Sequence, residues 1–330
     1  MIICRTPFRV SFFGGGTDYP AWYYDNGGAV ISATINKYSY ITARWLPPFF
    51  EYKHRIRYFR TEEVASVGDI EHPSVREVVK HLKIEKGLEI VHNADLPARS
   101  GLGSSSAFTV GMLHSLYSLQ NKMPSKRQLG LEAILIEQEK IGESVGSQDQ
   151  VAAAFGGLNY IKFSQGNEFL VDPIIVSEER IRTLEKSIVL VFTGFARTAS
   201  ELAEKQISAI PKITSELNLM KQICDEALSI MVSPGSHILE LGPLLNEQWK
   251  IKRKITDFVS NAAIDSIYEL GMKNGAVGGK LLGAGGGGFM MFLVPNEKRD
   301  LLIESLDQKM VVPFRFDFQG SQIVYHASPE

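Results

Sequence analysis

The sequence is poor in cysteine. Its 330 residues include two, Cys4 and Cys224, and neither belongs to a pattern that resembles a metal cluster or a redox pair. Free cysteine behaves mostly as a small buried hydrophobe. We therefore expect two inert, buried thiols and a reducing compartment.

The sequence also lacks a dominant charge and a long apolar run. A formal net charge of −2 gives no overall field that would attract nucleic acid or an anionic membrane, so an anionic ligand has to be held by a local site. The longest apolar stretch, Phe289 to Pro295, has the length of a strand rather than of a membrane span. The apolar run at the start of the chain is too short for a secretory signal. These absences predict a cytosolic protein.

The predicted elements form clusters of strands and then clusters of helices, which is typical of an α+β protein rather than a doubly wound parallel sheet. A length of 330 residues fits two domains, which we place at 1–183 and 184–330. The predicted strands cover 2–13, 28–46, 53–60, 87–93, 156–163, 168–174, 187–192, 289–294 and 322–327. The predicted helices cover 72–82, 107–120, 126–141, 198–230, 236–250, 252–273 and 297–307. In the strand at 53–60 basic residues alternate with apolar ones, which fits a solvated strand face or a phosphate-binding strip.

A segment rich in glycine and serine, Pro97 to Ala107, precedes an apolar-periodic helix. Glycines let the backbone approach an anion closely, and a helix N-terminus offers unpaired N–H groups and a positive dipole end. The segment does not match the nucleotide loop G-x-x-x-x-G-K-[ST], because no lysine follows the glycines, and it lacks the third glycine of a dinucleotide fingerprint. It predicts a phosphate-binding loop, with a flexible turn and a serine N-cap as the alternative.

Two further segments combine glycines with a strand. Phe8 to Pro20 runs from a strand into three glycines and Thr-Asp, which places polar side chains at a strand end, a common position for ligand contacts. Asp18 in this segment could also be a turn residue or a helix cap. Lys280 to Phe289 holds five glycines in six positions, which costs chain entropy unless the backbone needs unusual angles or close contact. Its apolar flanks favour a packed loop over a flexible linker.

Two carboxylates in the region 126–150 stand out. In a helix over 128–141, Glu137 lies on the apolar face, where a carboxylate needs a cation, hydrogen-bond donors or a proton. A buried salt bridge and a magnesium ligand both satisfy this need, and helix geometry does not choose between them. Asp149 lies at the entrance of the next helix, which it could simply cap.

In combination, the three glycine-rich segments resemble the motifs of the GHMP kinase superfamily, in the same order and over nearly the whole chain. The matching segments are Arg9 to Tyr19, Pro97 to Ala107 and Leu282 to Phe289. The amino-acid sequences at 5–20, 146–157 and 193–198 are most similar to those of the D-glycero-D-manno-heptose 7-phosphate kinases. This resemblance implies the GHMP kinase fold, with an N-terminal domain like domain 2 of ribosomal protein S5 and a ferredoxin-like C-terminal domain.

The resemblance also implies roles for single residues. Asp149 would accept the proton of the sugar hydroxyl, and Arg9 would lower the pKa of that aspartate and stabilise developing charge. Ser105 and Glu137 would hold Mg²⁺. The ATP phosphates would lie on the loop of Pro97, Arg99, Ser100, Gly101, Leu102, Gly103, Ser104, Ser105 and Ser106. The sugar would contact Gly15, Gly16, Thr17, Asp18 and Arg197, with Gly285, Gly286 and Gly287 closing over the transferred phosphate.

The implied reaction is in-line transfer of the ATP γ-phosphoryl group to the anomeric C1 hydroxyl of heptose 7-phosphate. The 1,7-bisphosphate formed would lead to GDP-heptose and surface polysaccharide. Galactokinases carry Glu-His where this chain has Gly15-Gly16, so we expect a sugar other than galactose. Arg197 is our candidate for holding the substrate's own phosphate, with an ion pair between the domains as the alternative.

Several alternatives stay open at this point. The protein could be another GHMP sugar kinase, fucokinase-like or galactokinase-like, or a non-catalytic sugar- and ATP-binding regulator on the same fold. The basic strip of Lys53, Arg55 and Arg57 is the next candidate for the substrate phosphate. As partners we expect a small-molecule sugar phosphate, with no nucleic acid and no membrane, and leave a homodimer open.

Overall fold

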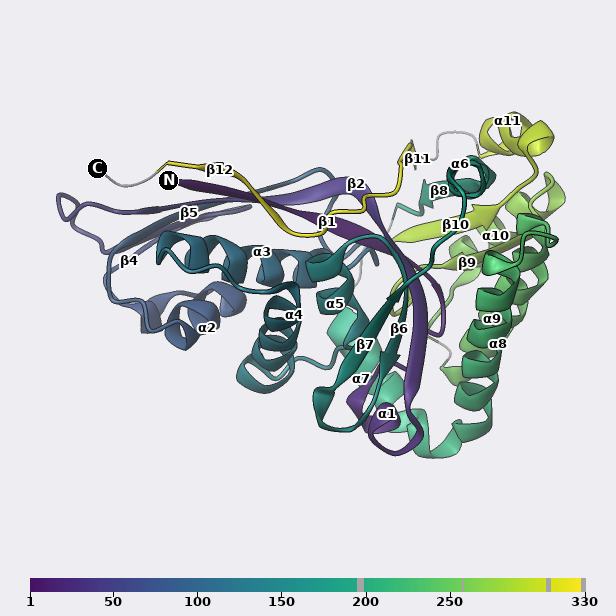
Figure 1. Cartoon of the computed structure of the whole chain (residues 1–330), viewed down its shortest axis with the longest axis horizontal. Coiled ribbons are helices and arrows are strands. Elements are labelled where there is room, and N and C mark those ends of the chain that lie inside the picture. The colour runs from purple at the N-terminus through teal and green to yellow at the C-terminus, as the bar shows by residue number, and fades with distance from the viewer. Residues whose placement is uncertain (195–198, 257, 307–309, 328–330) are drawn as a thin grey trace.

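The computed structural model describes residues 1–194, 199–256, 258–306 and 310–327, and these form two sheets with helices packed against them (Figure 1). The larger sheet has the order β12-β1-β2-β5-β3-β4, and β6 and β7 continue it from β2. Its strands are β1 (Ile2–Phe13), β2 (Gly28–Trp45), β3 (His54–Arg57), β4 (Thr61–Val64), β5 (Leu88–Ala94), β6 (Leu158–Phe163), β7 (Phe169–Pro173) and β12 (Gln322–His326). The pairs are antiparallel except for β3 with β5.

The smaller sheet confirms the ferredoxin-like prediction for the second half of the chain. Its antiparallel strands lie in the order β11-β8-β10-β9, so the first and second strands in sequence flank the third. This is the split β-α-β arrangement of ferredoxin-like folds. The strands are β8 (Ile188–Phe192), β9 (Gly278–Leu281), β10 (Phe289–Leu293) and β11 (Met310–Val311).

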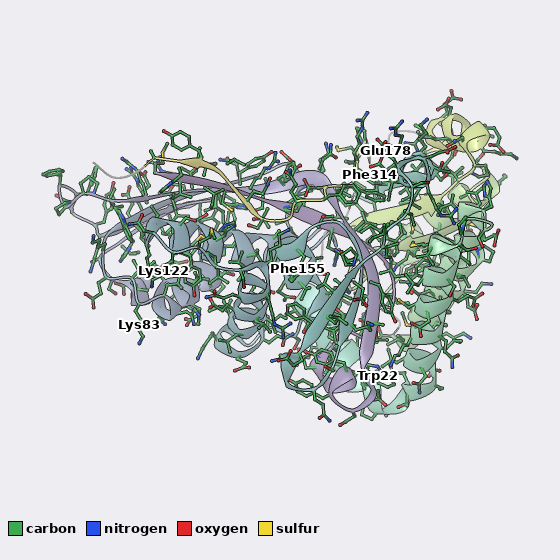
Figure 2. The ribbon with its side chains drawn as sticks, in the orientation of Figure 1. Trp22, Lys83, Lys122, Phe155, Glu178 and Phe314 are labelled. Atoms are coloured by element: carbon green, nitrogen blue, oxygen red, sulfur yellow. The ribbon has the colours of Figure 1, made fainter. Side chains whose placement is uncertain are left out.

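The helices of the first half cover one face of the larger sheet (Figure 1). The central one, α3 (Ser104–Leu119), packs on β1 and β2 and is buried along most of its length, because α2, α4 and α5 surround its other sides. These are α2 (Pro73–His81), α4 (Lys126–Ile134) and α5 (Gln148–Phe155), and a π-helical segment at Leu135–Ile141 continues α4. A short helix, α1 (Pro20–Asn26), buries Trp22 at the lower end of the molecule in Figure 2.

The helices of the second half are α6 (Glu178–Ser187), α7 (Ala199–Ala209), α8 (Thr214–Val232), α9 (Leu241–Ile255), α10 (Ala262–Lys273) and α11 (Asn296–Ser305). Short 3-10 turns lie at Val67–Asp69, Gln165–Asn167, Ile210–Lys212 and Ile238–Glu240. No helix in the described ranges combines the length and the apolarity needed to cross a membrane.

Most predicted elements are present, and the differences have local causes. The predicted helix over 198–230 is divided, because Pro211 lacks the N–H that would continue it. The predicted helix over 252–273 is interrupted after Ile255 and restarts at Ala262, where Asn261 caps α10 by accepting from two backbone N–H groups. The helices α1 and α6 were not predicted.

The two thiols are free and buried, as predicted, and burial raises the pKa of both the Cys4 and the Cys224 thiol. The domain division at 183 stays a prediction. The larger sheet extends beyond 1–183, since β12 returns near the end of the chain and pairs with β1 (Figure 1).

Two glycine-rich loops, one from each half of the chain, touch backbone to backbone. The Phe289 amide donates to the Ser100 carbonyl over 3.1 Å. A Cβ placed on Gly283 would lie 2.5 Å from the Gly101 Cα, and one placed on Gly288 would overlap the Ser100 carbonyl. Gly288 also has a φ of +102°, which side chains rarely adopt. Because these glycines have no side chains, the two loops can pack backbone against backbone.

This contact predicts that Gly288→Ala destabilises the protein. The added methyl group has to displace backbone rather than a mobile side chain, so we expect a loss of about 2 kcal/mol or more in the free energy of unfolding. Urea unfolding measures it. Gly235→Ala is the matched control, because a Cβ there meets no atom within 4 Å, and its effect should stay within about 0.5 kcal/mol. Equal stability of the two variants would contradict the conclusion that the loop contact requires a glycine at position 288.

Candidate active site

The three glycine-rich segments meet at one cavity of about 770 Å³. The first segment contributes Gly15, Gly16 and Asp18, and the third contributes Gly283 and Ala284. The second contributes Pro97, Ala98, Arg99, Gly101, Gly103, Ser104, Ser105 and Ser106. Segments far apart in sequence thus surround a single space.

An arginine and an aspartate form an ion pair where these segments converge. Arg9, buried on β1, donates through Nε to Asp149 Oδ1 over 2.6 Å and through Nη2 to Oδ2 over 2.8 Å. This two-bond geometry is the strongest form of a guanidinium–carboxylate contact. The Asp149 side chain keeps 24% of its surface exposed, and both residues line the cavity. The carboxylate is therefore fixed in position but accessible to a ligand.

The surrounding backbone positions this pair. Asp149 lies in the first turn of α5, where the positive end of the helix dipole favours a carboxylate. The third guanidinium nitrogen, Arg9 Nη1, donates to the Gly101 carbonyl over 2.7 Å, and the Arg9 amide donates to the Leu102 carbonyl. Gly103 has a φ of +72°, and a Cβ there would lie 3.2 Å from the Arg9 Cγ. The ion pair and the predicted phosphate loop are thus one rigid unit.

Glu137 is fully buried in the π-helical segment, on the face that the helical pattern predicted. Its Oε2 accepts from the Ser106 hydroxyl over 2.8 Å and from the Gln150 amide over 2.5 Å. Its Oε1 has no partner among the described residues. Burial raises the pKa of Glu137 to about 7. The nearby Thr109, Ser106 and Gln150 side chains oppose this shift, and Glu137 itself is not part of the cavity lining, which Ser105 and Ser106 reach.

Ser105 and Ser106 have different surroundings. Ser106 is buried against Glu137, whereas Ser105 is exposed and lines the cavity. In the part of the chain that the structure describes, no group of three His, Cys, Asp or Glu side chains could by itself hold a metal ion. The pairing of Ser105 with Glu137 around a metal stays a prediction, and the observed hydroxyl partner of Glu137 is Ser106.

Asp18 lies in the part of the cavity beyond the ion pair. Its Oδ1 accepts from the Gly16 amide over 2.8 Å, and its Oδ2 accepts from the Gln148 side chain over 2.9 Å. Burial raises the pKa of Asp18, and the nearby Asp149 adds to this shift. Thr17 is buried instead, and its hydroxyl donates to the Gly14 and Ala29 carbonyls, so it supports the loop.

Other predicted residues lie elsewhere. Gly285 packs on Val259, and the Gly286 amide donates to the Val259 carbonyl, so this part of the loop contacts protein. Ser100 and Leu102 are also buried. Arg55 pairs with Glu89, and the residues Lys53, Arg55 and Arg57 are not part of the cavity lining. Arg197 lies outside the described residues.

Sequence reasoning missed the contribution of α9 and β9. Gln248 and Lys252 of α9 and Lys280 of β9 line the cavity beside Asp18. A signal existed in α9: Gln248 and Lys252 are one turn apart on the face that also carries Leu241 and Leu245. Polar residues at buried positions of an amphipathic helix point to a partner or a ligand.

The opposite end of the cavity is aromatic, which was also missed. Tyr58, Phe59, His72, His92 and Phe108 line it. The ring centroids of His72 and Phe108 are 4.6 Å apart and stacked, and His92 meets Phe108 edge-on at 4.8 Å. Burial lowers the pKa of His92 to about 4, so this imidazole is neutral near pH 7. Arg60 and Glu71, which pair with each other, also line the cavity. An aromatic wall of this kind suits a flat heterocyclic base.

Comparisons with known proteins agree with this geometry. The models of the GHMP kinases N terminal domain and of the GHMP kinases C terminal domain match residues 73–157 and 232–312. A D-glycero-alpha-D-manno-heptose 7-phosphate kinase from Campylobacter jejuni is 31% identical over 328 residues, which cover 96% of each chain. A galactokinase from Pyrococcus furiosus is 26% identical and covers 95% of this chain and 94% of that one.

A solved structure extends the agreement to the fold. The crystal structure of a D-glycero-D-manno-heptose 1-phosphate kinase from Bacteroides thetaiotaomicron matches with a TM-score of 0.79 and 25% identity, over 99% of this chain and 100% of that one. The two-domain fold, both family models and the full-length similarity therefore lead to one conclusion. The chain belongs to the GHMP kinase family, and it is a phosphotransferase that acts on an alcohol group.

Proposed function

We propose that this protein uses ATP and Mg²⁺ to phosphorylate the C1 hydroxyl of D-glycero-D-manno-heptose 7-phosphate. The observation that carries the proposal is the Arg9–Asp149 ion pair, held at 2.6 Å and 2.8 Å beside the glycine–serine loop and open to the cavity. A positioned carboxylate beside a phosphate-binding loop suits the transfer of a phosphoryl group to a hydroxyl.

Asp149 is the group that would take the proton of the acceptor hydroxyl. General-base assistance of this kind contributes roughly 10²–10⁴-fold to a rate. Arg9 orients the carboxylate through two hydrogen bonds and supplies fixed positive charge where negative charge develops. Because its guanidinium is also bound to the Gly101 carbonyl, neither group has to reorganise during the reaction.

The nucleotide would lie along the second glycine-rich segment. Gly101, Gly103 and the serines at the start of α3 offer backbone N–H groups and hydroxyls to the phosphates. The aromatic end of the cavity would take the adenine ring, and His72 and Phe108 form its stacked wall.

The residues around Glu137 fit a magnesium ion. Among the residues that the structure describes, Glu137 Oε1 accepts no hydrogen bond, and Ser105 and Ser106 offer hydroxyls at the cavity. Mg²⁺ prefers oxygen ligands and commonly takes one or two carboxylates together with substrate phosphates and water. When bound, it would neutralise charge on the phosphates.

The sugar would occupy the part of the cavity lined by Gly15, Gly16 and Asp18. Two small residues at the entrance leave room for an acceptor larger than a hexose, and Asp18 can bind sugar hydroxyls. The names of two relatives both support a heptose phosphate, but one places the substrate phosphate at position 7 and the other at position 1. We favour position 7 because the relative with that substrate has the higher identity.

A panel of acceptors tests this proposal. ADP release should be measured with heptose 7-phosphate, heptose 1-phosphate, free heptose, galactose, fucose and mevalonate. We expect heptose 7-phosphate to give the highest kcat/KM, about ten- to a hundredfold above free heptose, because a charge-assisted hydrogen bond contributes ~1.5–3 kcal/mol. Phosphorus NMR of the product should show the new phosphate at C1.

Asp149→Asn is the control for this panel, and it should lower kcat about 10²–10⁴-fold. A preference for any other acceptor would contradict the heptose 7-phosphate assignment and leave the kinase family unaffected. Saturable binding of sugar and ATP without turnover would show a regulator instead.

Glu137 gives a prediction that does not depend on turnover. Since burial raises its folded-state pKa to about 7 from 4.5, the buried carboxyl favours folding when it is protonated. That contribution is complete below about pH 4.5 and is lost as the pH rises through 7. In EDTA, the unfolding free energy of the wild type relative to Glu137→Gln should therefore fall between pH 5 and 8, by roughly 3 kcal/mol at most.

Urea unfolding at four pH values checks this expectation. Magnesium should restore stability to the wild type at pH 8 but not to Glu137→Gln. Glu139→Gln, an exposed position two residues further along, is the matched control and should follow the wild type throughout. Parallel curves for the wild type and Glu137→Gln would rule out a titrating, metal-binding carboxylate.

A further inference from the structure

One buried cation in the cavity has no role in the mechanism described so far. Lys252 lies on α9 with 8% of its surface exposed, and it lines the cavity beside Asp18 and Gly283. Its Nζ donates to the Gly283 carbonyl. That carbonyl is the one acceptor for this ammonium among the described residues, although a lysine ammonium has three protons to donate.

The neighbouring Lys280 differs in this respect. Its Nζ donates to the Ser11 and Phe12 carbonyls, each over 3.0 Å, so this ammonium is bound to the end of β1. Lys280 therefore serves to hold β1 against β9. Lys252 keeps donors for a further acceptor.

The surroundings of Lys252 favour an anion as that acceptor. The charged groups that face it are Arg9 of β1, Lys280 of β9 and Asp18 of the first glycine-rich segment. Asp18 already accepts two hydrogen bonds, and Asp149 is engaged by Arg9. Burial, Lys252 and Arg9 lower the pKa of Lys280 well below its usual value, so the positive charge in this buried space comes chiefly from Lys252 and Arg9. Burying such charge is costly unless a ligand compensates it.

The position of Lys252 relative to the glycine loops further limits which anion it could bind. Arg9 donates to the Gly101 carbonyl of the second segment, and Lys252 donates to the Gly283 carbonyl of the third. These two loops touch at Gly101 and Gly283. Each of the two cations therefore binds one of the loops where they touch, beside the space in which the phosphoryl group would pass from donor to acceptor.

We propose that Lys252 binds a phosphoryl oxygen of the substrates and is a further catalytic residue of this kinase. The inference rests on the proposed function. Two sources of that oxygen share this chemistry, the phosphoryl group in transfer and the phosphate that the acceptor already carries.

Steady-state kinetics of Lys252→Met with heptose 7-phosphate and with free heptose tests the proposal. We expect kcat/KM to fall about ten- to a hundredfold, the effect of losing one charge-assisted hydrogen bond. A loss confined to the phosphorylated acceptor assigns the ammonium to the acceptor's phosphate, and an equal loss with both acceptors assigns it to the transferred group. Unchanged kcat/KM with both acceptors would overturn the proposal.

Two further variants separate this role from a structural one. Lys250→Met removes an exposed lysine of the same helix and should leave kcat/KM within about twofold.

Burial and Arg9 lower the pKa of Lys252 to about 8, against the opposing effect of Asp18. The wild-type kcat/KM should therefore decline above about pH 8 as the ammonium loses its proton, and Lys252→Arg should move that decline to higher pH. An identical pH profile in Lys252→Arg would contradict the proposal.

Calorimetric measurement of inorganic pyrophosphate binding tests the role of Lys252 without requiring catalytic turnover. Lys252→Met should bind it about tenfold more weakly than the wild type, and equal affinity would overturn the proposal. If the wild type phosphorylates no sugar but binds pyrophosphate more tightly than Lys252→Met does, the proposed function is wrong and the proposal that Lys252 binds a phosphoryl oxygen is supported. Should Lys252→Met not fold, Lys252→Gln takes its place in both measurements.

Discussion

The site depends on a single guanidinium. Arg9 holds the Asp149 carboxylate with two nitrogens and the Gly101 carbonyl with the third, while its own amide is bound to the Leu102 carbonyl. It therefore connects β1, the N-terminus of α5 and the glycine–serine loop at one point. Lysine offers no planar set of donors, so it could not make these contacts together. The residues that would take the proton and bind the phosphates are fixed relative to each other by this one side chain.

Close backbone contact between the two halves of the chain completes the site. The loops that contain Gly101 and Gly283 approach so closely that neither position has room for a side chain. The second half then adds Lys252 and Lys280 to a cavity whose ion pair of Arg9 and Asp149 comes from the first. The candidate active site is thus shared between the two halves, and glycines far apart in sequence pack together beside one cavity.

Much of this arrangement could be predicted from the sequence, because glycine loops and helical periodicity are local signals. The burial of Glu137 followed from its place among apolar helix positions, and it holds even though the segment is π-helical. A motif does not fix rotation about a helix, however: the Ser106 hydroxyl donates to Glu137, and Ser105, predicted to share a metal ion with Glu137, lines the cavity. Lys252 was hidden by the basic run Lys250 to Lys254, which resembles a solvated helix face. The helical spacing of Lys252 with Leu241 and Leu245 is the signal that separates it from the exposed Lys250 and Lys254.

A double-mutant cycle between Arg9 and Asp149 tests the central claim most directly. kcat/KM should be measured for the wild type, Arg9→Met, Asp149→Asn and the double variant under one set of conditions. If the two side chains act as one unit, each single change should cost at least about a hundredfold, and the double variant should be about as slow as the slower single variant. Losses that multiply in the double variant would mean that the two residues act independently, and they would contradict the account.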